Sequence, residues 1–286
     1  MSHQKSLEKR DGHSTKGIFS SDEPLIMGIL NVTPDSFSDG ARFNQFDQAL
    51  AHAEEMIEQG ADIIDIGGES TRPGAKAVSE SEEIKRVIPL VERVSRLGVP
   101  VSVDTSKPGV MRASAEAGAG MINDVRALTE PGALAVVSEI KLPVCLMHMQ
   151  GQPRTMQHNP SYQDVVSEVK GFLRERIAAC VNAGIDTSLI AIDPGFGFGK
   201  TLPHNLELLT QLSCFNDLNV PILAGLSRKS MLGQITGRDV NDRLAASLAV
   251  ALIAMQQGAK IIRVHDVKQT SDVKKIFIAT NTAELI

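Results

Sequence analysis

The sequence lacks the segments that would carry the chain into or across a membrane. No apolar run approaches the ~18 residues that a membrane-spanning helix needs. Residues 1–24 are polar, with lysine and glutamate interspersed, and contain no apolar core of the kind found in signal peptides. We therefore expect a cytoplasmic protein without a membrane partner, and we interpret residues 1–24 as a disordered N-terminal tail.

Cysteine is scarce as well. The three cysteines, Cys145, Cys180 and Cys214, are odd in number, widely spaced and set among apolar residues. This pattern excludes a disulfide framework and a cysteine-rich metal site, and it is typical of reduced thiols in the cytoplasm.

The sequence also has no excess of positive charge. Its 34 aspartates and glutamates outnumber its 29 lysines and arginines, which gives a formal net charge of -5. A basic face is the electrostatic feature of proteins that bind nucleic acid, so this balance argues against such a partner. An anionic ligand would have to be attracted by a local cluster of cations.

What the 286 residues do contain is a repeated alternation of helix-length and strand-length segments. An amphipathic stretch ends in Gly-Ala or a close variant, and a short apolar run follows, at Gly60, Gly118, Gly184 and Gly258. Glycine suits the left-handed position that ends a helix. Short β-branched runs suit strands buried on both faces, as in a parallel sheet.

This alternation predicts a single-domain (β/α)8 TIM barrel from Leu25 to Ile286. The predicted strands are Leu25–Leu30, Ile63–Ile66, Val101–Val103, Met121–Ile122, Val144–Met147, Leu189–Ile192, Ile222–Gly225 and Ile261–Val264. The predicted helices include Phe46–Gln59, Ser79–Leu97, Tyr162–Ala183, Val240–Gln257 and Val267–Thr280. A doubly wound open sheet is the rival, but no glycine-rich dinucleotide fingerprint follows the first strand.

Polar or ionisable residues follow every predicted strand, at the end where such barrels build their active sites. They are Asn31, Thr71 and Arg72, Asp104, Asn123 and Asp124, His148, Asp193, Ser227 to Lys229, and Arg263 with His265. Contact with water would explain one such residue but not all eight positions. The two long loops at residues 31–46 and 67–78, rich in glycine, proline and small polar residues, could close over a ligand.

The cations among these residues predict an anion pocket. They are Arg72, Lys229, Arg263 and His265, with Arg228 adjacent. Charged donors bind a carboxylate or phosphate about twice as strongly as neutral ones. The backbone between Ser227 and Ser230 lies at a strand-to-helix turn, where N–H groups could hold the same anion.

The even-numbered strands contribute four polar residues that could face one another: Asp65, Asn123, Asp193 and Arg263. Asp193 and Asn123 together suit the edge of a flat, nitrogen-rich heterocycle. We interpret Asp65 as a structural partner that holds Arg263, because a buried guanidinium requires a counter-charge.

Seven motifs, in order and at strand ends, resemble the dihydropteroate synthase family of pterin-binding enzymes. They are MGILNVTPDSFSDG (27–40), DIGGESTRPGA (65–75), SVDTSKP (102–108), INDV (122–125), DPGFGFGK (193–200), GLSRKSM (225–231) and RVHDV (263–267). The resemblance implies condensation of p-aminobenzoate with 7,8-dihydropterin-6-ylmethyl diphosphate, with release of diphosphate, in folate biosynthesis. It also implies a sulfonamide target and a homodimer, for which the apolar helix at 240–257 is a candidate interface.

The resemblance further implies roles for individual residues. The pterin diphosphate would be bound by Thr71, Asp104, Asn123, Asp193, Lys229, Arg263 and His265, of which Lys229, Arg263 and Asp104 would be catalytic. The p-aminobenzoate pocket would be framed by Arg72, Pro73, Phe198 and Ser230. Asn31 would help to hold a Mg²⁺ ion that accompanies the diphosphate.

Two alternatives remain open at this point. A methyltetrahydrofolate-binding methyltransferase domain that serves a corrinoid protein would share Asn123 and Asp193, but it would not need the loop at 67–75 or the turn at 225–231. A pterin-binding barrel without turnover would not need the complete set of strand-end groups. His148 and His158 lack a third ligand, so we do not interpret them as a zinc site.

Overall fold

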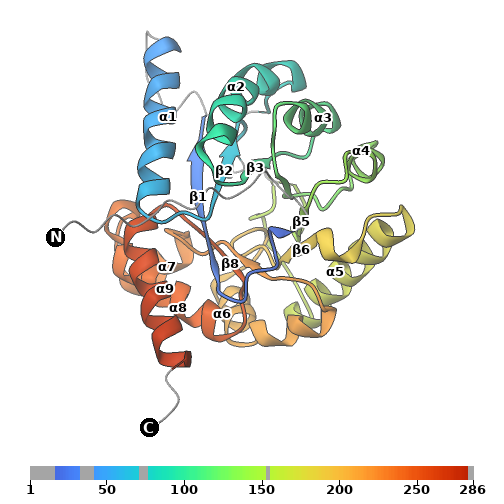
Figure 1. Cartoon of the computed structure of the whole chain (residues 1–286). Helices are drawn as coiled ribbons and strands as arrows, with labels where there is room; N and C mark the ends of the chain where they lie inside the picture. Colours follow the sequence, from blue (N-terminus) through green and yellow to red (C-terminus); the bar gives the residue numbers. More distant parts are fainter. Residues whose placement is uncertain (1–16, 33–41, 71–76, 153–154, 283–286) are drawn as a thin grey trace, which may run out of the picture.

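The computed structural model describes residues 17–32, 42–70, 77–152 and 155–282, and within these ranges eight parallel strands form a barrel surrounded by helices (Figure 1). The strands are β1 (Leu25–Asn31), β2 (Ile63–Gly67), β3 (Val101–Asp104), β4 (Met121–Asp124), β5 (Val144–Met147), β6 (Ile190–Asp193), β7 (Leu223–Ala224) and β8 (Ile261–Val264).

The barrel closes between β6 and β7. Parallel ladders join the strands in the order β6-β5-β4-β3-β2-β1-β8-β7. A parallel bridge between Ile192 and Ile222 then joins β6 to the residue just before β7. The predicted (β/α)8 barrel is confirmed, and the open sheet is excluded.

Helices alternate with the strands and cover the outside of the barrel (Figure 1). They are α1 (Arg42–Glu58), α2 (Glu80–Val94), α3 (Pro108–Glu116), α4 (Ala133–Ile140), α5 (Val165–Asn182), α6 (Leu202–Thr210), α7 (Ser230–Thr236), α8 (Leu244–Gln256) and α9 (Val267–Thr282). Gly60, Gly118, Gly184 and Gly258 all have positive φ, between 86° and 100°, as predicted for residues that end helices.

Several predicted boundaries need correction. The region predicted as one helix at 240–257 is a 3-10 turn at Val240–Asp242 followed by α8, and the helix predicted at 79–97 ends at Val94 and continues as a 3-10 turn. Strands β1 to β4 and β6 run one or two residues further than predicted, because their last residues, polar in all but β2, still pair in the ladders. The strand predicted at 222–225 is shortened to Leu223–Ala224.

Alternation along the strands separates two apolar clusters. Residues such as Ile26, Ile64 and Ile122 point outward and join the large core between strands and helices. Their neighbours of opposite parity, such as Met27 and Ile63, form a smaller cluster inside the barrel. Inward-pointing residues nearer the C-terminal strand ends are therefore held above this inner layer.

The N-terminal boundary lies earlier than predicted. Ile18 and Phe19, which we had assigned to the tail, pack against the cluster inside the barrel. Both side chains are partly buried against this cluster, which includes Leu25, the first residue of β1. The part of the tail at residues 1–16 lies outside the described residues.

Candidate active site

The side chains that line the site follow from the same alternation. Asn123, Asp193, Met147 and Arg263 are each two residues beyond an inward-pointing residue of their strand. Asp104 has the parity opposite to that of the outward-pointing Val101 and Val103. Five strands thus present an inward-facing side chain near their C-terminal ends. These residues surround a hollow at the C-terminal end of the barrel.

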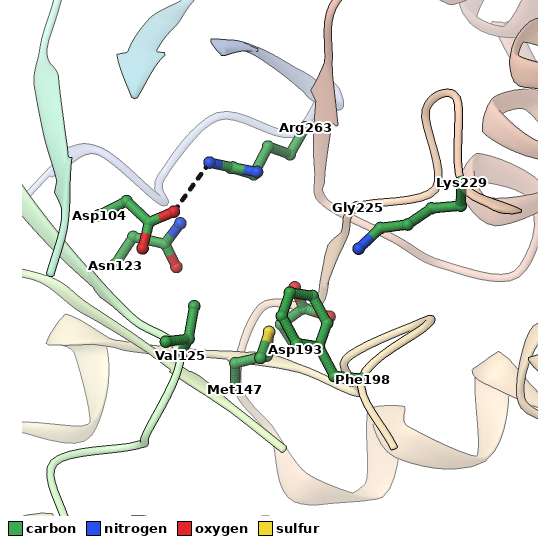
Figure 2. A pocket seen from close by; sticks show the side chains of 9 residues that line it. All are labelled: Asp104, Asn123, Val125, Met147, Asp193, Phe198, Gly225, Lys229 and Arg263. Carbon is green, nitrogen blue, oxygen red and sulfur yellow. Dashed lines mark hydrogen bonds and ion pairs between the residues drawn. The ribbon is translucent and has the colours of Figure 1, made fainter. Parts of the chain in front are cut away.

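The hollow is a pocket with about 340 Å³ of empty space, part of which is open to solvent. Its lining residues are Asp104, Asn123, Val125, Met147, Asp193, Phe198, Gly225, Lys229 and Arg263 (Figure 2). Six of the predicted site residues are in this set, although they are spread over 160 residues of sequence.

Arg263 is held in place by two carboxylates. Its Nε donates to Asp65 Oδ2 at 2.6 Å, and its Nη2 donates to Asp104 Oδ2 at 3.0 Å. The Asn123 amide also donates to Asp65 Oδ2, at 3.1 Å. The predicted structural role of Asp65, which is fully buried, is confirmed by these contacts.

These contacts and burial shift the pKa values of both partners. Burial tends to lower the pKa of Arg263, but Asp65 and Asp104 outweigh it and raise that pKa above its usual value. Burial raises the pKa of Asp104 to about 7; Arg263 opposes this shift, while the neighbouring carboxylates, Asp65 first, add to it. Asp104 can therefore gain or lose a proton near neutral pH.

Asp193 lies across the pocket from this cluster (Figure 2). Its Oδ1 accepts a 2.7 Å hydrogen bond from the backbone N–H of Gly195, which orients the carboxylate. Burial raises its pKa, whereas Gly195 and the nearby lysines favour the charged form. The second carboxylate oxygen is within reach of a ligand in the pocket, since Asp193 lines it.

Lys229 reaches into the pocket from the turn between β7 and α7. Its Nζ lies 4.2 Å from the centroid of the Phe198 ring, a cation–π contact. Burial lowers its pKa to about 8, although Asp193 partly restores the charge. The ammonium group is thus largely protonated at neutral pH and is aimed at the centre of the cavity (Figure 2).

The remaining predicted residues after β7 and β8 are not among the lining residues of the pocket. His265 contacts Ser227 through its Nδ1, at 3.1 Å from Ser227 Oγ. Ser230 is the first residue of α7 and is exposed. Arg228 does not join the anion pocket, because its guanidinium pairs with Asp266 with an Nε–Oδ2 distance of 3.0 Å.

The loop residues predicted to contact the substrates lie partly outside the described residues: this applies to Thr71, Arg72 and Pro73. Asn31, predicted to help hold Mg²⁺, ends β1, and its Oδ1 lies 3.5 Å from the point that a Gly67 Cβ would occupy. Oδ2 of Asp104 lies 3.9 Å from the same point. In the described ranges no three His, Cys, Asp or Glu residues form a group that could hold a metal.

Three lining residues carry no predicted role: Val125, Met147 and Gly225. Val125 and Met147 have the inward parity of Asn123 and Asp193, which is the signal that could have found them. Gly225 follows β7, and a Cβ there would lie 3.8 Å from Asp193 Oδ2. These residues are apolar or lack a side chain, so a pattern of polar residues at strand ends does not indicate them.

Comparison with known proteins identifies the class. The pterin-binding enzyme family matches residues 27–265, so the chain belongs to this family. The dihydropteroate synthase of Escherichia coli K12 is 56% identical over 262 residues, which cover 91% of this chain and 93% of that protein.

Solved structures of dihydropteroate synthases are also similar to this chain. The dihydropteroate synthase of Yersinia pestis with a sulfonamide drug complex is 54% identical, with a TM-score of 0.88 over 93% of this chain and 96% of that chain. The dihydropteroate synthase of Xanthomonas albilineans with 4-aminobenzoic acid is 52% identical, with a TM-score of 0.87 over 92% and 94%. The protein is therefore an enzyme, a transferase of the dihydropteroate synthase type.

Proposed function

We propose that this enzyme joins p-aminobenzoate to 7,8-dihydropterin-6-ylmethyl diphosphate and releases diphosphate. The observation that carries the proposal is the pocket itself, in which the buried carboxylate of Asp193 and the cations Lys229 and Arg263 line one cavity. Similarity to dihydropteroate synthases across the whole barrel supports it over the corrinoid methyltransferase alternative.

Asp193 is suited to bind the pterin ring. The 2-amino group and the adjacent ring N–H of a pterin form a donor pair that one carboxylate can accept side by side. Asn123 offers both a donor and an acceptor to the same ring, and Val125 and Met147 add apolar contact with its faces. The Gly195 N–H, by holding one oxygen of Asp193, sets the plane of the carboxylate in advance.

Lys229 and Arg263 act on the departing diphosphate. The amine of p-aminobenzoate is neutral at pH 7 and needs no strong base, so the difficult event is the growth of negative charge on the leaving group. Preorganised cations lower the free energy of such a transition state. Phe198, which stacks against Lys229, and Ser230 would border the aminobenzoate ring and its carboxylate.

A Mg²⁺ ion would arrive with the diphosphate and be held by Asn31, supplying a Lewis acid for the same charge. Mg²⁺ commonly takes only one or two protein ligands together with phosphate oxygens and water. The donors here fit that pattern. The amide oxygen of Asn31 and Oδ2 of Asp104 both lie within 4 Å of the point that a Cβ on Gly67 would occupy.

The deciding experiment is diphosphate release when the purified protein is mixed with both substrates and Mg²⁺. We expect release only when all three components are present, together with formation of dihydropteroate. Binding of the pterin diphosphate without release in the presence of p-aminobenzoate would refute the proposal. We further propose that the enzyme acts in the cytoplasm as a homodimer.

A further inference from the structure

One buried lysine has no part in the chemistry described above. Lys200 is 3% exposed and ends the loop at residues 194–200, which links β6 to α6 and carries Phe198. Its Nζ donates to the backbone carbonyls of Gly195 and Phe198, at 2.9 and 3.0 Å. Its third close partner is Nδ1 of His148, at 3.0 Å.

The three hydrogens of the Lys200 ammonium group thus have three close acceptors, and the carbonyl of His148 is a fourth, longer one at 3.4 Å. Burial lowers the pKa of Lys200 to about 7. In the charged form the ammonium can only donate, so Nδ1 of His148 accepts and the neutral imidazole carries its proton on Nε2. Burial, reinforced by the charge of Lys200, lowers the pKa of His148 to about 3, in keeping with this assignment. The lysine therefore links two carbonyls of one loop to the histidine that follows β5.

The surrounding contacts show that this loop is positioned from several directions. The Tyr162 hydroxyl donates to the Gly199 carbonyl at 2.8 Å, and Asn205 Oδ1 accepts from the Gly197 N–H at 2.7 Å. Lys200 is the only described side chain with hydrogen bonds to two carbonyls of the 194–200 loop. One of those carbonyls belongs to Phe198, whose ring contacts the Lys229 ammonium.

We propose that Lys200 is a positioning residue that acts through Phe198 to shape the aminobenzoate side of the site. The inference rests on the proposed function, because it assigns Phe198 to that substrate. A buried ammonium surrounded by carbonyls loses much hydration, and it is tolerated only when its donors are fully matched. In return it holds the Phe198 backbone at a fixed distance from the end of β5.

The test is a double-mutant cycle between Lys200→Met and Phe198→Ala. Methionine keeps the length and apolar stem of the side chain but removes the three donors. We expect Lys200→Met to raise the KM for p-aminobenzoate about tenfold, since small displacements of a positioning group are costly. The Kd of the pterin diphosphate, measured by calorimetry, should change much less, because Asp193 and Asn123 lie on strands.

In the Phe198→Ala background, Lys200→Met should change the same KM less than about twofold, because residues that act through one another are not additive. Multiplicative effects of the two substitutions, or an equal loss of pterin affinity in Lys200→Met, would overturn the proposal. Lys274→Met is the matched control: this lysine is also largely buried and bonded, to Asp62 at 2.9 Å at the N-terminal end of β2. It should lower the melting temperature without changing the KM.

If Lys200→Met does not fold, Tyr162→Phe keeps the idea testable, because it removes one hydroxyl that holds the same loop. It should raise the KM for p-aminobenzoate about threefold, the effect of one lost hydrogen bond, and an unchanged KM would overturn the inference. Failure of the wild-type protein to release diphosphate would instead refute the proposed function. The two failures are therefore distinguishable.

Discussion

The two cations that line the pocket, Arg263 and Lys229, have different contacts. Arg263 is bonded to Asp65 and Asp104 and forms a stationary part of the wall. Lys229 rests on an aromatic ring and extends into the cavity. The Lys229 ammonium can therefore move with the leaving group as negative charge develops on it. The fixed Arg263 guanidinium instead contributes a constant positive potential.

Lys229→Ala should therefore reduce kcat/KM by about a hundredfold or more, equivalent to about 3 kcal/mol of transition-state stabilisation. Diphosphate release under saturating and limiting substrate measures the effect. Lys170→Ala, which removes an ion pair with the exposed Asp217 on the outer surface, is the control and should leave the rate unchanged. Near-normal turnover of Lys229→Ala would show that its charge is not used.

The shifted pKa values of Asp104 and Lys229 predict a bell-shaped dependence of kcat/KM on pH. Burial raises the pKa of Asp104 to about 7, so the carboxylate that pairs with Arg263 forms as pH rises through this value. Burial lowers the pKa of Lys229 to about 8, so the ammonium is lost as pH rises further. Activity should thus increase through about pH 7 and decrease through about pH 8.

Two variants assign the limbs of this profile. Asp104→Asn should remove the acidic limb, and Lys229→Arg, whose guanidinium stays protonated, should move the alkaline limb to higher pH. A profile that is level between pH 6 and pH 9 in the wild-type enzyme would contradict both assignments.

At the scale of elements, the loops after β5 and β6 are in close backbone contact. Gly195 has φ +72°, and a Cβ on it would lie 1.9 Å from the His148 carbonyl oxygen. The same glycine orients Asp193 through its N–H. No side chain fits here without separating the two loops.

Gly195→Ala should therefore damage both stability and substrate use. Gly98→Ala is its matched control, because Gly98 also has a positive φ, +88°, but a Cβ there meets nothing within 4 Å. The control should lower the free energy of unfolding by about 1 kcal/mol from backbone strain alone and leave kcat/KM unchanged. Equal effects of the two substitutions in denaturant unfolding and in turnover would show that the loop contact is unimportant.

At the scale of the whole molecule, the surface is uneven in its apolar content. Apolar side chains are exposed around the outer half of α8: Leu244 and Ile253 are 37% and 39% exposed, and Leu248 and Leu252, which lie between them around the helix, are partly exposed. Val240, just before α8, is 46% exposed. A continuous apolar helix face of this kind is typical of an interface. No described helix is sufficiently long and apolar to traverse a bilayer.

We predict that Ile253→Glu converts a homodimer into a monomer, as measured by sedimentation velocity. A charge buried in an interface is costly unless it is paired. Val181→Glu is the control, because Val181 is exposed to a similar extent, 46%, on α5. It should leave the sedimentation coefficient unchanged. A wild-type protein that sediments as a monomer at micromolar concentration would refute the prediction.

The sequence by itself determined the barrel and the polar strand ends. Strand alternation, helix-ending glycines such as Gly60 and polar residues such as Asn123 are local features, because they reflect the geometry of a few consecutive residues. For this reason the strand order and six of the pocket residues could be predicted without coordinates.

Apart from the predicted pairing of Arg263 with Asp65, only the tertiary structure decided which of these groups pair. Arg263 meets Asp65 and Asp104 across 198 and 159 residues of sequence. Arg228, which precedes Lys229 in the sequence, instead pairs with Asp266. In the sequence, Lys200 is a lysine at the end of a glycine-rich loop and nothing indicates burial, but in the structure it is buried against His148. Burial and pairing depend on distances through space, and barrel closure between β6 and β7 sets those distances only after the whole chain has folded.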